Sequence, residues 1–509
     1  MSLYGRLKGH ADQQPEKLAI DSDDFSLSYK QLLDRVDQHV DYFRTLELNP
    51  GDRIAFLALN HPDIFVAVFA AVQTGLILVP LNWRLSVDEL QYVMDDCQPR
   101  LLMHDTEFAE TAIELITRSC SDSSGGVKLQ LIGQPDTDLA SSPLTAPELD
   151  QQGSIPEESQ PLDQPLLIVY TSGTTGRPKG AVLNQKALLC SSEMTQHMLD
   201  LTCDDRVLNV LPLFHVGGLN IQPLPTLLFG ASLYLHARFN PVQAALAISA
   251  HRITLINSVP TVLQAIIDTS AWDTADVSSL RAISIGSTDV PIPLIKQVQQ
   301  RGVPLLQVYG ATETSPVAIY QKVEDASLVG SIGRAGLHCD VRIADENNVT
   351  VAAGRSGEIQ VRGDNILSFY WNNPEATDSS VVDGWFKTGD VAHEDKNGFY
   401  WFDDRLKHVI ISGGENIYPA ELERVIRVLD GVDAVSVVGR PDARWGEVPV
   451  AVVVGSVDKD NVKNACTQLA RFKQPKEIIY VDDLPRNALG KIQVHQVKEL
   501  VLTVSQNYQ

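Results

Sequence analysis

A short polar segment at residues 170–180 constrains this chain more strongly than any other feature. It reads Y-T-S-G-T-T-G-R-P-K-G and follows the apolar run Leu166–Tyr170, so we predict a loop that leaves the end of a buried strand. Its glycines let the backbone bend sharply and turn N–H groups toward one point, and its hydroxyls and lysine add further donors. Polyphosphate oxygens only accept hydrogen bonds. We therefore predict that the loop holds a nucleoside triphosphate through Thr171, Ser172, Gly173, Thr174, Thr175, Gly176 and Lys179.

Two other interpretations of this loop are weaker. A flexible polar connection is the ordinary meaning of a segment rich in Gly, Ser and Thr, but the buried strand before it weighs against that. A P-loop needs four residues between its glycines and a Lys-Ser/Thr pair directly after them. Here two residues separate Gly173 from Gly176, and Pro178 precedes Lys179. The loop is therefore expected to bind the triphosphate in another manner.

Length and charge narrow the class of protein. A chain of 509 residues is too long for one core, so about two to four domains are expected. The net charge of −23 argues against non-specific binding to nucleic acid or to anionic membranes. The 6 cysteines show no C-x-x-C spacing, and no apolar run is long enough to span a membrane. We expect a cytoplasmic protein with no transmembrane segment.

Apolar segments of strand length alternate with helix-length stretches over much of the chain, which predicts an α/β fold. A buried helix is expected at 63–72 and strands at 76–80, 206–211, 254–257, 282–285 and 305–309, whereas 121–164 is expected to contain a surface connection. The last strands end in the polar clusters 286–288 and 310–313. Because ligands of open α/β sheets bind beyond the carboxyl ends of the strands, these clusters and the opening loop are expected to meet at one crevice.

Two further motifs carry carboxylates. Tyr309 begins Y-G-A-T-E-T, and a glutamate beside a phosphate site needs a cation between them, so Mg²⁺ is the natural partner of Glu313. Alone, Glu313 would be a solvated loop residue. Asp390 ends G-W-F-K-T-G-D, and one carboxylate can accept from two vicinal ribose hydroxyls, although an Asp after Thr-Gly also caps turns.

In their order along the chain, these motifs resemble those of the adenylate-forming enzymes, namely acyl-CoA synthetases, peptide-synthetase adenylation domains and beetle luciferases. The resemblance covers residues 10–495. It implies a large N-terminal adenylation domain of paired α/β sheets and a small β-barrel at 1–404. A hinge at 405–408 and a mobile C-terminal α+β lid at 409–509 would follow.

The resemblance also implies roles for single residues. Glu313 and Thr175 would bind Mg²⁺, Thr312 would contact phosphate, and the adenine would lie near Ser287, Thr288, Asp289, Tyr309 and Gly310. Asp390 and Arg405 would hold the ribose. In P-R-N-A-L-G-K-I, Lys491 would bridge the attacking carboxylate and the α-phosphate, where pentavalent phosphorus gathers charge. Without the resemblance, Lys491 is simply a surface charge.

Further implied positions concern coenzyme A and the acid. Lys407 would be the hinge, and Ser412, Gly413, Gly414 and Trp445 would lie near coenzyme A. In P-L-F-H-V-G-G-L-N, His215 is either a packed core residue or the gate of the acyl pocket, and these two interpretations have equal weight. Nothing charged lines that stretch, so an apolar or aromatic acid is expected, in a pocket formed by His215, Val216, Gly217, Asn220 and Ala311.

The implied activity is an ATP-dependent acid–CoA ligase that forms an acyl-adenylate and then a thioester. Fatty and aryl or cinnamic acids both remain open, as does a homodimer. An acyl-AMP ligase that loads a carrier protein, a peptide-synthetase domain and a non-catalytic sensor are the alternatives. Departures from the family pattern stand at Asp289, His408, Gln185 and Gln474. Asp289, Gln185 and Gln474 do not touch the transferring phosphate, so an effect on affinity rather than a loss of activity is expected from them, while the consequence of His408 stays open.

Overall fold

The structure is a computed structural model, and it describes residues 1–23, 25–119, 127–132, 161–171, 178–287, 290–412, 415–442, 445–471, 473–486 and 491–506. The chain divides into two compact units. The first contains Met1–Val341 and Val361–Phe386, and the second contains Arg342–Gln360 and Lys387–Gln509. Among the described helices, none combines the length and the apolar character that crossing a membrane requires.

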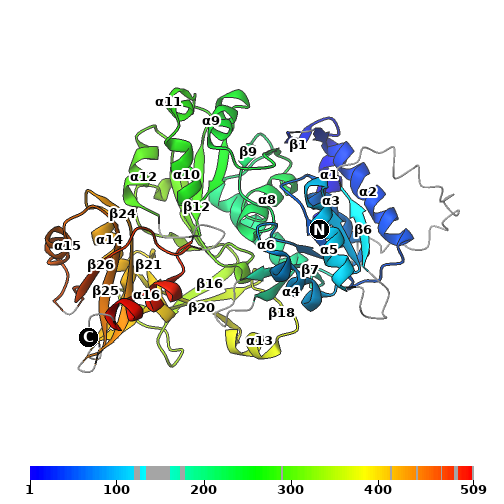
Figure 1. Ribbon diagram of the computed structural model, residues 1–509. Helices are drawn as coiled ribbons and strands as arrows, with labels where there is room; N and C mark the ends of the chain where they lie inside the picture. Colours follow the sequence, from blue (N-terminus) through cyan, green and yellow to red (C-terminus); the bar gives the residue numbers. More distant parts are fainter. Residues whose placement is uncertain are drawn as a thin grey trace. The chain divides into compact units, whose positions relative to one another are not determined.

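A nine-stranded sheet lies in the first unit, and its six central strands are parallel (Figure 1). Its core strands are short and mostly buried, with mainly apolar side chains, as expected for a sheet covered on both faces. The strands, in spatial order, are β15 (Arg334–Ala335), β14 (Ile319–Tyr320), β13 (Leu305–Tyr309), β12 (Ala282–Gly286), β11 (Leu255–Ser258), β9 (Arg206–Asn209), β10 (Ser232–Leu235), β1 (Leu18–Ser22) and β2 (Ser26–Ser28).

A seven-stranded sheet also lies in the first unit. The strand before the glycine-rich loop, β7, belongs to this sheet and pairs antiparallel with the strand after the loop, β8. The order is β18 (Phe369–Tyr370), β8 (Lys179–Asn184), β7 (Pro165–Thr171), β4 (Ile77–Pro80), β3 (Arg53–Leu57), β5 (Leu101–His104) and β6 (Lys128–Leu131). The strands predicted at 76–80 and before the loop are confirmed, and β6 lies inside the stretch predicted as a surface connection.

Helices of the first unit begin at recognisable signals. Ser28 and Ser86 each close a capping box with Gln31 and Glu89, which satisfies amide groups that the first turn leaves unpaired. The helix predicted at 63–72 is α3. The helices are α1 (Leu3–Gln13), α2 (Tyr29–Thr45), α3 (Asp63–Thr74), α4 (Val87–Cys97), α5 (Ala109–Ser119), α6 (Gln185–Leu199), α7 (Val216–Leu219), α8 (Pro223–Leu228), α9 (Pro241–Ala250), α10 (Pro260–Ile267), α11 (Ser270–Thr274), α12 (Ile292–Gln299) and α13 (Pro374–Ser380).

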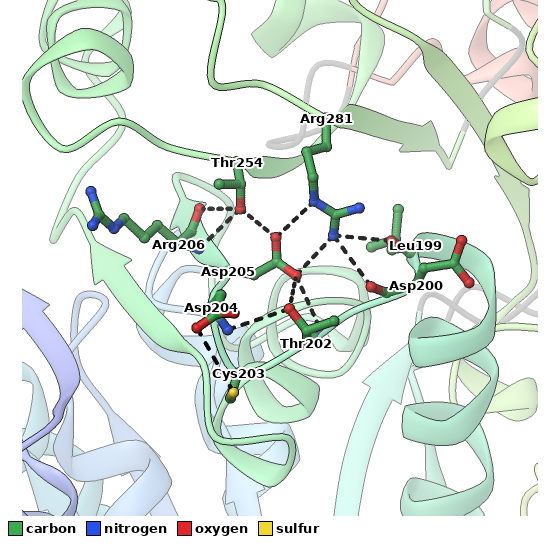
Figure 2. Close-up of polar contacts among 9 residues, drawn as sticks. All are labelled: Leu199, Asp200, Thr202, Cys203, Asp204, Asp205, Arg206, Thr254 and Arg281. Atoms are coloured by element: carbon green, nitrogen blue, oxygen red, sulfur yellow. Dashed lines mark hydrogen bonds and ion pairs between the residues drawn. The ribbon is translucent and has the colours of Figure 1, made fainter. Parts of the chain in front are cut away.

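A buried carboxylate joins the starts of three neighbouring strands of the nine-stranded sheet. Asp205, 3% exposed, precedes β9 and accepts from Nε and Nη2 of Arg281 at 3.0 and 2.8 Å. It also accepts from the hydroxyl of Thr254 at 2.7 Å. Thr254 precedes β11 and Arg281 precedes β12. Figure 2 shows the carboxylate of Asp205 in contact with both side chains. Arg281 Nη2 also donates to the carbonyl of Leu199 at the end of α6, at 3.2 Å. This network aligns the strands whose opposite ends form the site described below.

Two five-stranded sheets complete the chain. One of them has β16 (Cys339–Ala344), β17 (Gly357–Gly363), β20 (Trp385–Glu394), β19 (Val381–Val382) and β21 (Tyr400–Arg405). The other, in the second unit, has β23 (Glu415–Ile417), β22 (Ile410–Ser412), β25 (Gly446–Gly455), β24 (Val432–Asp442) and β26 (Glu477–Tyr480), with helices α14 (Pro419–Arg427), α15 (Lys459–Cys466) and α16 (Val494–Gln506).

The predicted fold class, a large N-terminal α/β part followed by a small C-terminal part, is confirmed. The boundaries predicted at 404 and 409 remain predictions. The division into two compact units assigns Arg342–Gln360 and the part of β20 from Lys387 onward, which includes Asp390, to the second unit.

Candidate active site

Two predicted polar clusters lie at the same edge of the nine-stranded sheet. β12 and β13 are parallel neighbours, and Gly286 is in register with Val308. Ser287 therefore follows β12 beside the point where β13 ends at Tyr309 and Gly310 begins the next turn. Such an edge is where ligands of α/β sheets bind. The third predicted cluster, the glycine-rich loop, follows a strand of the other sheet, and its residues 172–177 lie outside the described residues.

The turn after β13 presents Glu313. A side chain at Gly310 would place its Cβ 1.6 Å from the carbonyl oxygen of Pro316, so only glycine allows this close approach. The hydroxyl of Thr314 accepts from the amide of Ala311 at 2.9 Å, which starts a short 3₁₀ turn at Thr312–Thr314. The turn leaves Thr312 and Glu313 partly exposed while Thr314 is buried.

One tyrosine brings the two sheets' functional side chains together. Tyr370 in β18 donates its hydroxyl to Oε1 of Glu313 at 2.7 Å. Its ring lies under Lys179, whose Nζ is 5.6 Å from the ring centroid. The amide of Leu367 also donates to the carbonyl of Glu313 at 2.8 Å. Burial and the Glu313 carboxylate raise the pKa of Tyr370, so the hydroxyl stays protonated and remains a donor.

Sequence reasoning missed Tyr370. It stands in a strand of two residues, and no spacing or turn residue marks it as functional. Its position comes from pairing of β18 with β8, in which Tyr370 faces Ala181. This is a tertiary contact between segments nearly two hundred residues apart, which no local pattern records.

A Mg²⁺ ion at Glu313 is compatible with these residues. No group of three or more His, Cys, Asp or Glu side chains among the described residues could hold a metal alone. Mg²⁺ does not require such a group, because it usually binds through one or two carboxylates together with substrate phosphates and water. Glu313 supplies one carboxylate, and Tyr370 orients it. Thr175, the second predicted metal ligand, lies outside the described residues.

His215 lies at the start of α7 in an aromatic setting. Its ring centroid is 4.6 Å from that of Phe214, whose ring is edge-on to Trp83 at 6.0 Å. Burial, and to a lesser degree the charge of Arg84, lowers the pKa of His215 to about 4. The imidazole is therefore neutral near pH 7. Its Nε2 is buried and has no hydrogen-bond partner among the described residues.

In the second unit, Asp390 and Arg405 face each other. They are cross-strand partners in β20 and β21, and Arg405 Nε is 3.2 Å from Asp390 Oδ1. The turn before Asp390 is anchored on β17, because Thr388 donates to the carbonyl of Ile359 at 2.8 Å. The amide of Asp390 in turn donates to the Thr388 hydroxyl at 3.1 Å. The two predicted ribose contacts are thus brought together.

The predicted hinge residues lie just beyond this pair. Lys407 and His408 belong to a 3₁₀ turn after β21. His408 stands where the family pattern has an acidic residue. Its Nδ1 lies 3.9 Å from Oδ1 of the buried Asp404. Burial and then the charge of Lys407 lower the pKa of His408 to about 4. Burial raises the pKa of Asp404 to about 6, although it accepts from the amide of Ala420 at 2.7 Å.

Lys491 shares the electrostatic environment of these residues. Part of the Lys491 side chain is exposed, yet desolvation of its ammonium group by the surrounding protein lowers the pKa of Lys491 to about 8. The charge of Arg405 lowers the pKa further, Asp390 acts in the opposite direction, and Lys407 adds a smaller lowering effect. The described part of the second unit therefore places a readily titrated lysine among Asp390, Arg405 and Lys407.

The remaining predicted positions are scattered or undescribed. Thr171 is the last residue of β7, and Ser412, at the end of β22, is 7% exposed. Trp445 is 44% exposed and donates its amide to Asp442 at 3.0 Å. Residues outside the described part include Ser172, Gly173, Thr174, Gly176, Thr288, Asp289, Gly413 and Gly414.

Two departures from the family pattern have local structural roles. Gln185 is 4% exposed, and its Oε1 accepts from the amide of Leu3 at 2.7 Å, which ties the start of α1 to the start of α6. Gln474 donates to the carbonyl of Leu469 at 3.1 Å. Both amides are engaged within their own units.

The fold and the order of the motifs define a large α/β enzyme that activates its substrate with a nucleotide. The chain matches the model of the AMP-binding enzyme family over residues 7–371 and that of the AMP-binding enzyme C-terminal domain over residues 421–491. It belongs to the AMP-binding enzyme family, and the predicted resemblance is confirmed.

Characterised relatives are acid–CoA ligases. The chain is 42% identical to an indoleacetate–CoA ligase of Aromatoleum aromaticum, over 98% of each chain. It is 39% identical to a feruloyl-CoA synthase of an Amycolatopsis species, over 96% of each chain. ATP-bound MatB from Rhodopseudomonas palustris has the same fold, with a TM-score of 0.88, 30% identity and coverage of 98% and 99%. The chain is an AMP-forming acyl-CoA synthetase.

Proposed function

We propose that this chain joins an aryl or other apolar carboxylic acid to coenzyme A through an acyl-adenylate. The observation that carries the proposal is the placement of Lys179 and Glu313 on one tyrosine, Tyr370, beside the strand ends. This arrangement occurs in a chain that is similar to acid–CoA ligases over nearly its whole length. The ammonium of Lys179 suits the phosphates of a Mg–ATP complex, and the carboxylate of Glu313 suits its metal.

The first half-reaction is attack of the substrate carboxylate on the α-phosphate of ATP, which yields acyl-AMP and pyrophosphate. Lys179 and the loop before it would bind the phosphates that leave. Mg²⁺ at Glu313 and Thr175 would neutralise phosphate charge, and Thr312 would contact phosphate. Lys491 would place an ammonium where negative charge develops in the transition state, an interaction that lowers the barrier more than it stabilises the substrates.

The nucleoside would be held by one set of residues at its ribose and by another at its adenine. Asp390 can accept from ribose hydroxyls while Arg405, 3.2 Å away, fixes its carboxylate. Tyr309, with Ser287, Thr288, Asp289 and Gly310, would contact the adenine. In the second half-reaction the thiol of coenzyme A displaces AMP. For this step Ser412, Gly413, Gly414 and Trp445 are proposed contacts, and Lys407 is proposed as the hinge between the parts at 1–404 and 409–509.

The acid is proposed to be aromatic. His215 is neutral and lies in a group of aromatic rings, which favours an apolar partner over a charged one. Two relatives carry the names of aryl acids, indoleacetate and ferulate. A fatty acid is the second candidate, since a fatty acyl CoA synthetase of Mycobacterium tuberculosis has the same fold with a TM-score of 0.77 and 30% identity. Val216, Gly217, Asn220 and Ala311 complete the proposed pocket.

Pyrophosphate exchange with a panel of acids tests the first half-reaction. We expect labelled pyrophosphate to enter ATP only when a suitable acid is present, and Lys491→Ala to reduce the exchange by roughly 10²–10³-fold. A sensor without catalytic activity would show no exchange with any acid.

A second experiment identifies the thiol that receives the acyl group. AMP release should rise strongly when coenzyme A is added to ATP and the best acid. An enzyme that loads a carrier protein would make acyl-AMP without turning over on coenzyme A. A peptide-synthetase domain would prefer amino acids in the same panel. A homodimer and a cytoplasmic location remain predictions.

A further inference from the structure

A chain of hydrogen bonds connects the segment after His215 to the centre of the nine-stranded sheet. Asn257 in β11 donates its Nδ2 to the carbonyl of Gly217 at 2.9 Å. The hydroxyl of Ser284 in β12 donates to Oδ1 of Asn257 at 2.7 Å. Gln222, directly before α8, donates its Nε2 to the Ser284 hydroxyl at 3.1 Å. Asn257 and Ser284 are also cross-strand partners, so both are held rigidly.

The direction of every bond in this chain is fixed from one end. The carbonyl of Gly217 can only accept, so Asn257 must turn its Nδ2 toward it and its Oδ1 toward Ser284. The single hydroxyl proton of Ser284 goes to that oxygen. Ser284 can therefore only accept from its other neighbour, which obliges Gln222 to present its Nε2. The carboxamide oxygen of Gln222 is consequently directed away from Ser284 and is left as an acceptor.

This oxygen and a second one nearby in sequence are buried without partners. Gln222 is 1% exposed, and its Oε1 has no hydrogen-bond partner among the described residues. Asn220 is also 1% exposed. Its Nδ2 makes a long hydrogen bond to the carbonyl of Ser315, at 3.5 Å, and its Oδ1 has no partner in the described part of the chain. Buried acceptors of this kind are normally paired, because leaving them unpaired is unfavourable.

Both acceptors belong to the segment that bears the proposed acyl pocket. Asn220 ends α7, which starts at His215, and Gln222 follows two residues later. Gly217, on the same turn, is partly exposed, and a Cβ placed there would meet no atom within 4 Å. Space is thus present beside Gly217, and the residues that follow in the sequence carry the two buried acceptors. Together with the neutral His215 and the aromatic ring of Phe214, this segment offers apolar contacts and two uncharged acceptor groups.

We propose that Gln222 and Asn220 recognise a hydrogen-bond donor on the hydrophobic part of the substrate. The preferred acids are then aryl acids with a ring N–H or a phenolic O–H. This inference rests on the proposed acid–CoA ligase function. A donor on the ring satisfies an acceptor that the fold leaves unpaired. A substrate of the same shape without the donor excludes water and leaves that acceptor unpaired, and sites of this kind discriminate strongly against such analogues.

Pairs of acids that differ only in the donor test the proposal on the wild-type enzyme. One pair is indol-3-ylacetic acid and benzofuran-3-ylacetic acid, and another is 3-(4-hydroxyphenyl)propanoic acid and 3-(4-methylphenyl)propanoic acid, with octanoic acid alongside. We expect kcat/KM for CoA-dependent AMP release to favour the donor acid by about 10- to 100-fold in the best-accepted pair. Equal values within the pairs, or a higher value for octanoic acid, would overturn the proposal.

These results separate the inference from the function on which it rests. AMP release with several acids but no preference for donors removes only the role of Gln222 and Asn220, and would mean that internal water satisfies them. No AMP release with any acid removes the proposed function and this inference with it.

Variants assign the preference to residues. Gln222→Met keeps the shape of the side chain and removes the acceptor, so the ratio of kcat/KM within the best pair should fall to within about threefold. Ser284→Ala leaves Gln222 in place but removes the group that orients its carboxamide, and should also lower the ratio. Gln264→Met in α10 is the matched control, and it should leave the ratio of kcat/KM within the best pair unchanged. A wild-type ratio in folded Gln222→Met contradicts the proposal, and the wild-type comparison decides the matter if that variant does not fold.

Discussion

At the scale of single residues, the site depends on side chains that hold other side chains in position. Tyr370 contacts both a predicted metal ligand and a predicted phosphate ligand, donating to Glu313 at 2.7 Å and placing its ring 5.6 Å from Lys179. Its hydroxyl and its ring therefore have separable tasks. Partners that orient a metal ligand typically change metal affinity when they are removed.

Tyr370→Phe should weaken the use of Mg²⁺. The variant keeps the ring beside Lys179 but loses the hydrogen bond to Glu313, so the Mg²⁺ concentration for half-maximal pyrophosphate exchange should rise by about 10- to 100-fold. A titration of Mg²⁺ at fixed ATP measures this. Tyr234→Phe in β10 is the control, and an unchanged Mg²⁺ requirement in Tyr370→Phe would show that the contact has no role in metal binding.

Lys491 should impose an alkaline limit on the first half-reaction. Its pKa is lowered to about 8, so the ammonium is present below that pH and is lost as the pH rises through it. Above pH 8, kcat/KM for ATP in pyrophosphate exchange should fall by about tenfold per pH unit, because this parameter reports the free enzyme. Lys491→Arg, whose guanidinium stays charged, should lack this limit at a lower overall rate. An identical alkaline fall in that variant would assign the pKa to another group.

At the scale of secondary structure elements, one ion pair between a buried carboxylate and an exposed arginine joins the starts of neighbouring strands. Asp205 and Arg281 connect the starts of β9 and β12, and Thr254 adds β11 (Figure 2). These strands carry the polar groups of the proposed acyl pocket further along, including Asn257 and Ser284. A buried carboxylate that loses its cation is strongly destabilising, because the charge is left without compensation.

Arg281→Leu should therefore destabilise the first unit. Arg281 is itself partly exposed, so we expect a loss at the low end for such pairs, about 3 kcal/mol in the free energy of unfolding. Urea unfolding measures the loss. Asp204→Asn, one residue away and exposed, should change stability by less than about 0.5 kcal/mol. Equal stability of the two variants would mean that hydrogen bonds from Thr254 and Thr202 suffice for Asp205.

Helices and strands could be predicted from the sequence where their burial requires a recognisable spacing or run of apolar residues. Parallel strands such as β12 and β13 are short apolar runs, and α3 is a longer one, so periodicity and length identify them. The resemblance implied paired sheets, but local patterns do not assign each strand to one sheet or the other. Nothing local shows that β7 and β13 belong to different sheets, or that Tyr370 would join them.

The site shows the same division. Glu313, Asp390 and Arg405 stand in motifs with a chemical logic, and the structure places Asp390 beside Arg405. Their roles in binding remain predictions. Gln222 could not be identified in advance, because its meaning comes from the direction of hydrogen bonds through Ser284 and Asn257. Such directions require the three-dimensional arrangement.

At the scale of the whole molecule, a strongly acidic chain must bind anionic substrates. The net charge is −23, whereas ATP and coenzyme A are both polyanions. Local donors and cations can oppose the overall field, since it is weakened by salt over a Debye length of about 8–10 Å. Lys179 in the first unit and Arg405, Lys407 and Lys491 in the second would provide such local charge.

The fate of the carboxylate oxygens tests the proposed chemistry most directly. The best acid from the panel, labelled with oxygen-18 in its carboxylate, is incubated with ATP, Mg²⁺ and coenzyme A, and the products are analysed by mass spectrometry. Attack on the α-phosphate predicts one labelled oxygen in AMP, unlabelled pyrophosphate, and equal amounts of AMP and acyl-CoA. Label in orthophosphate together with ADP would contradict it, because the acid would then have attacked the γ-phosphate.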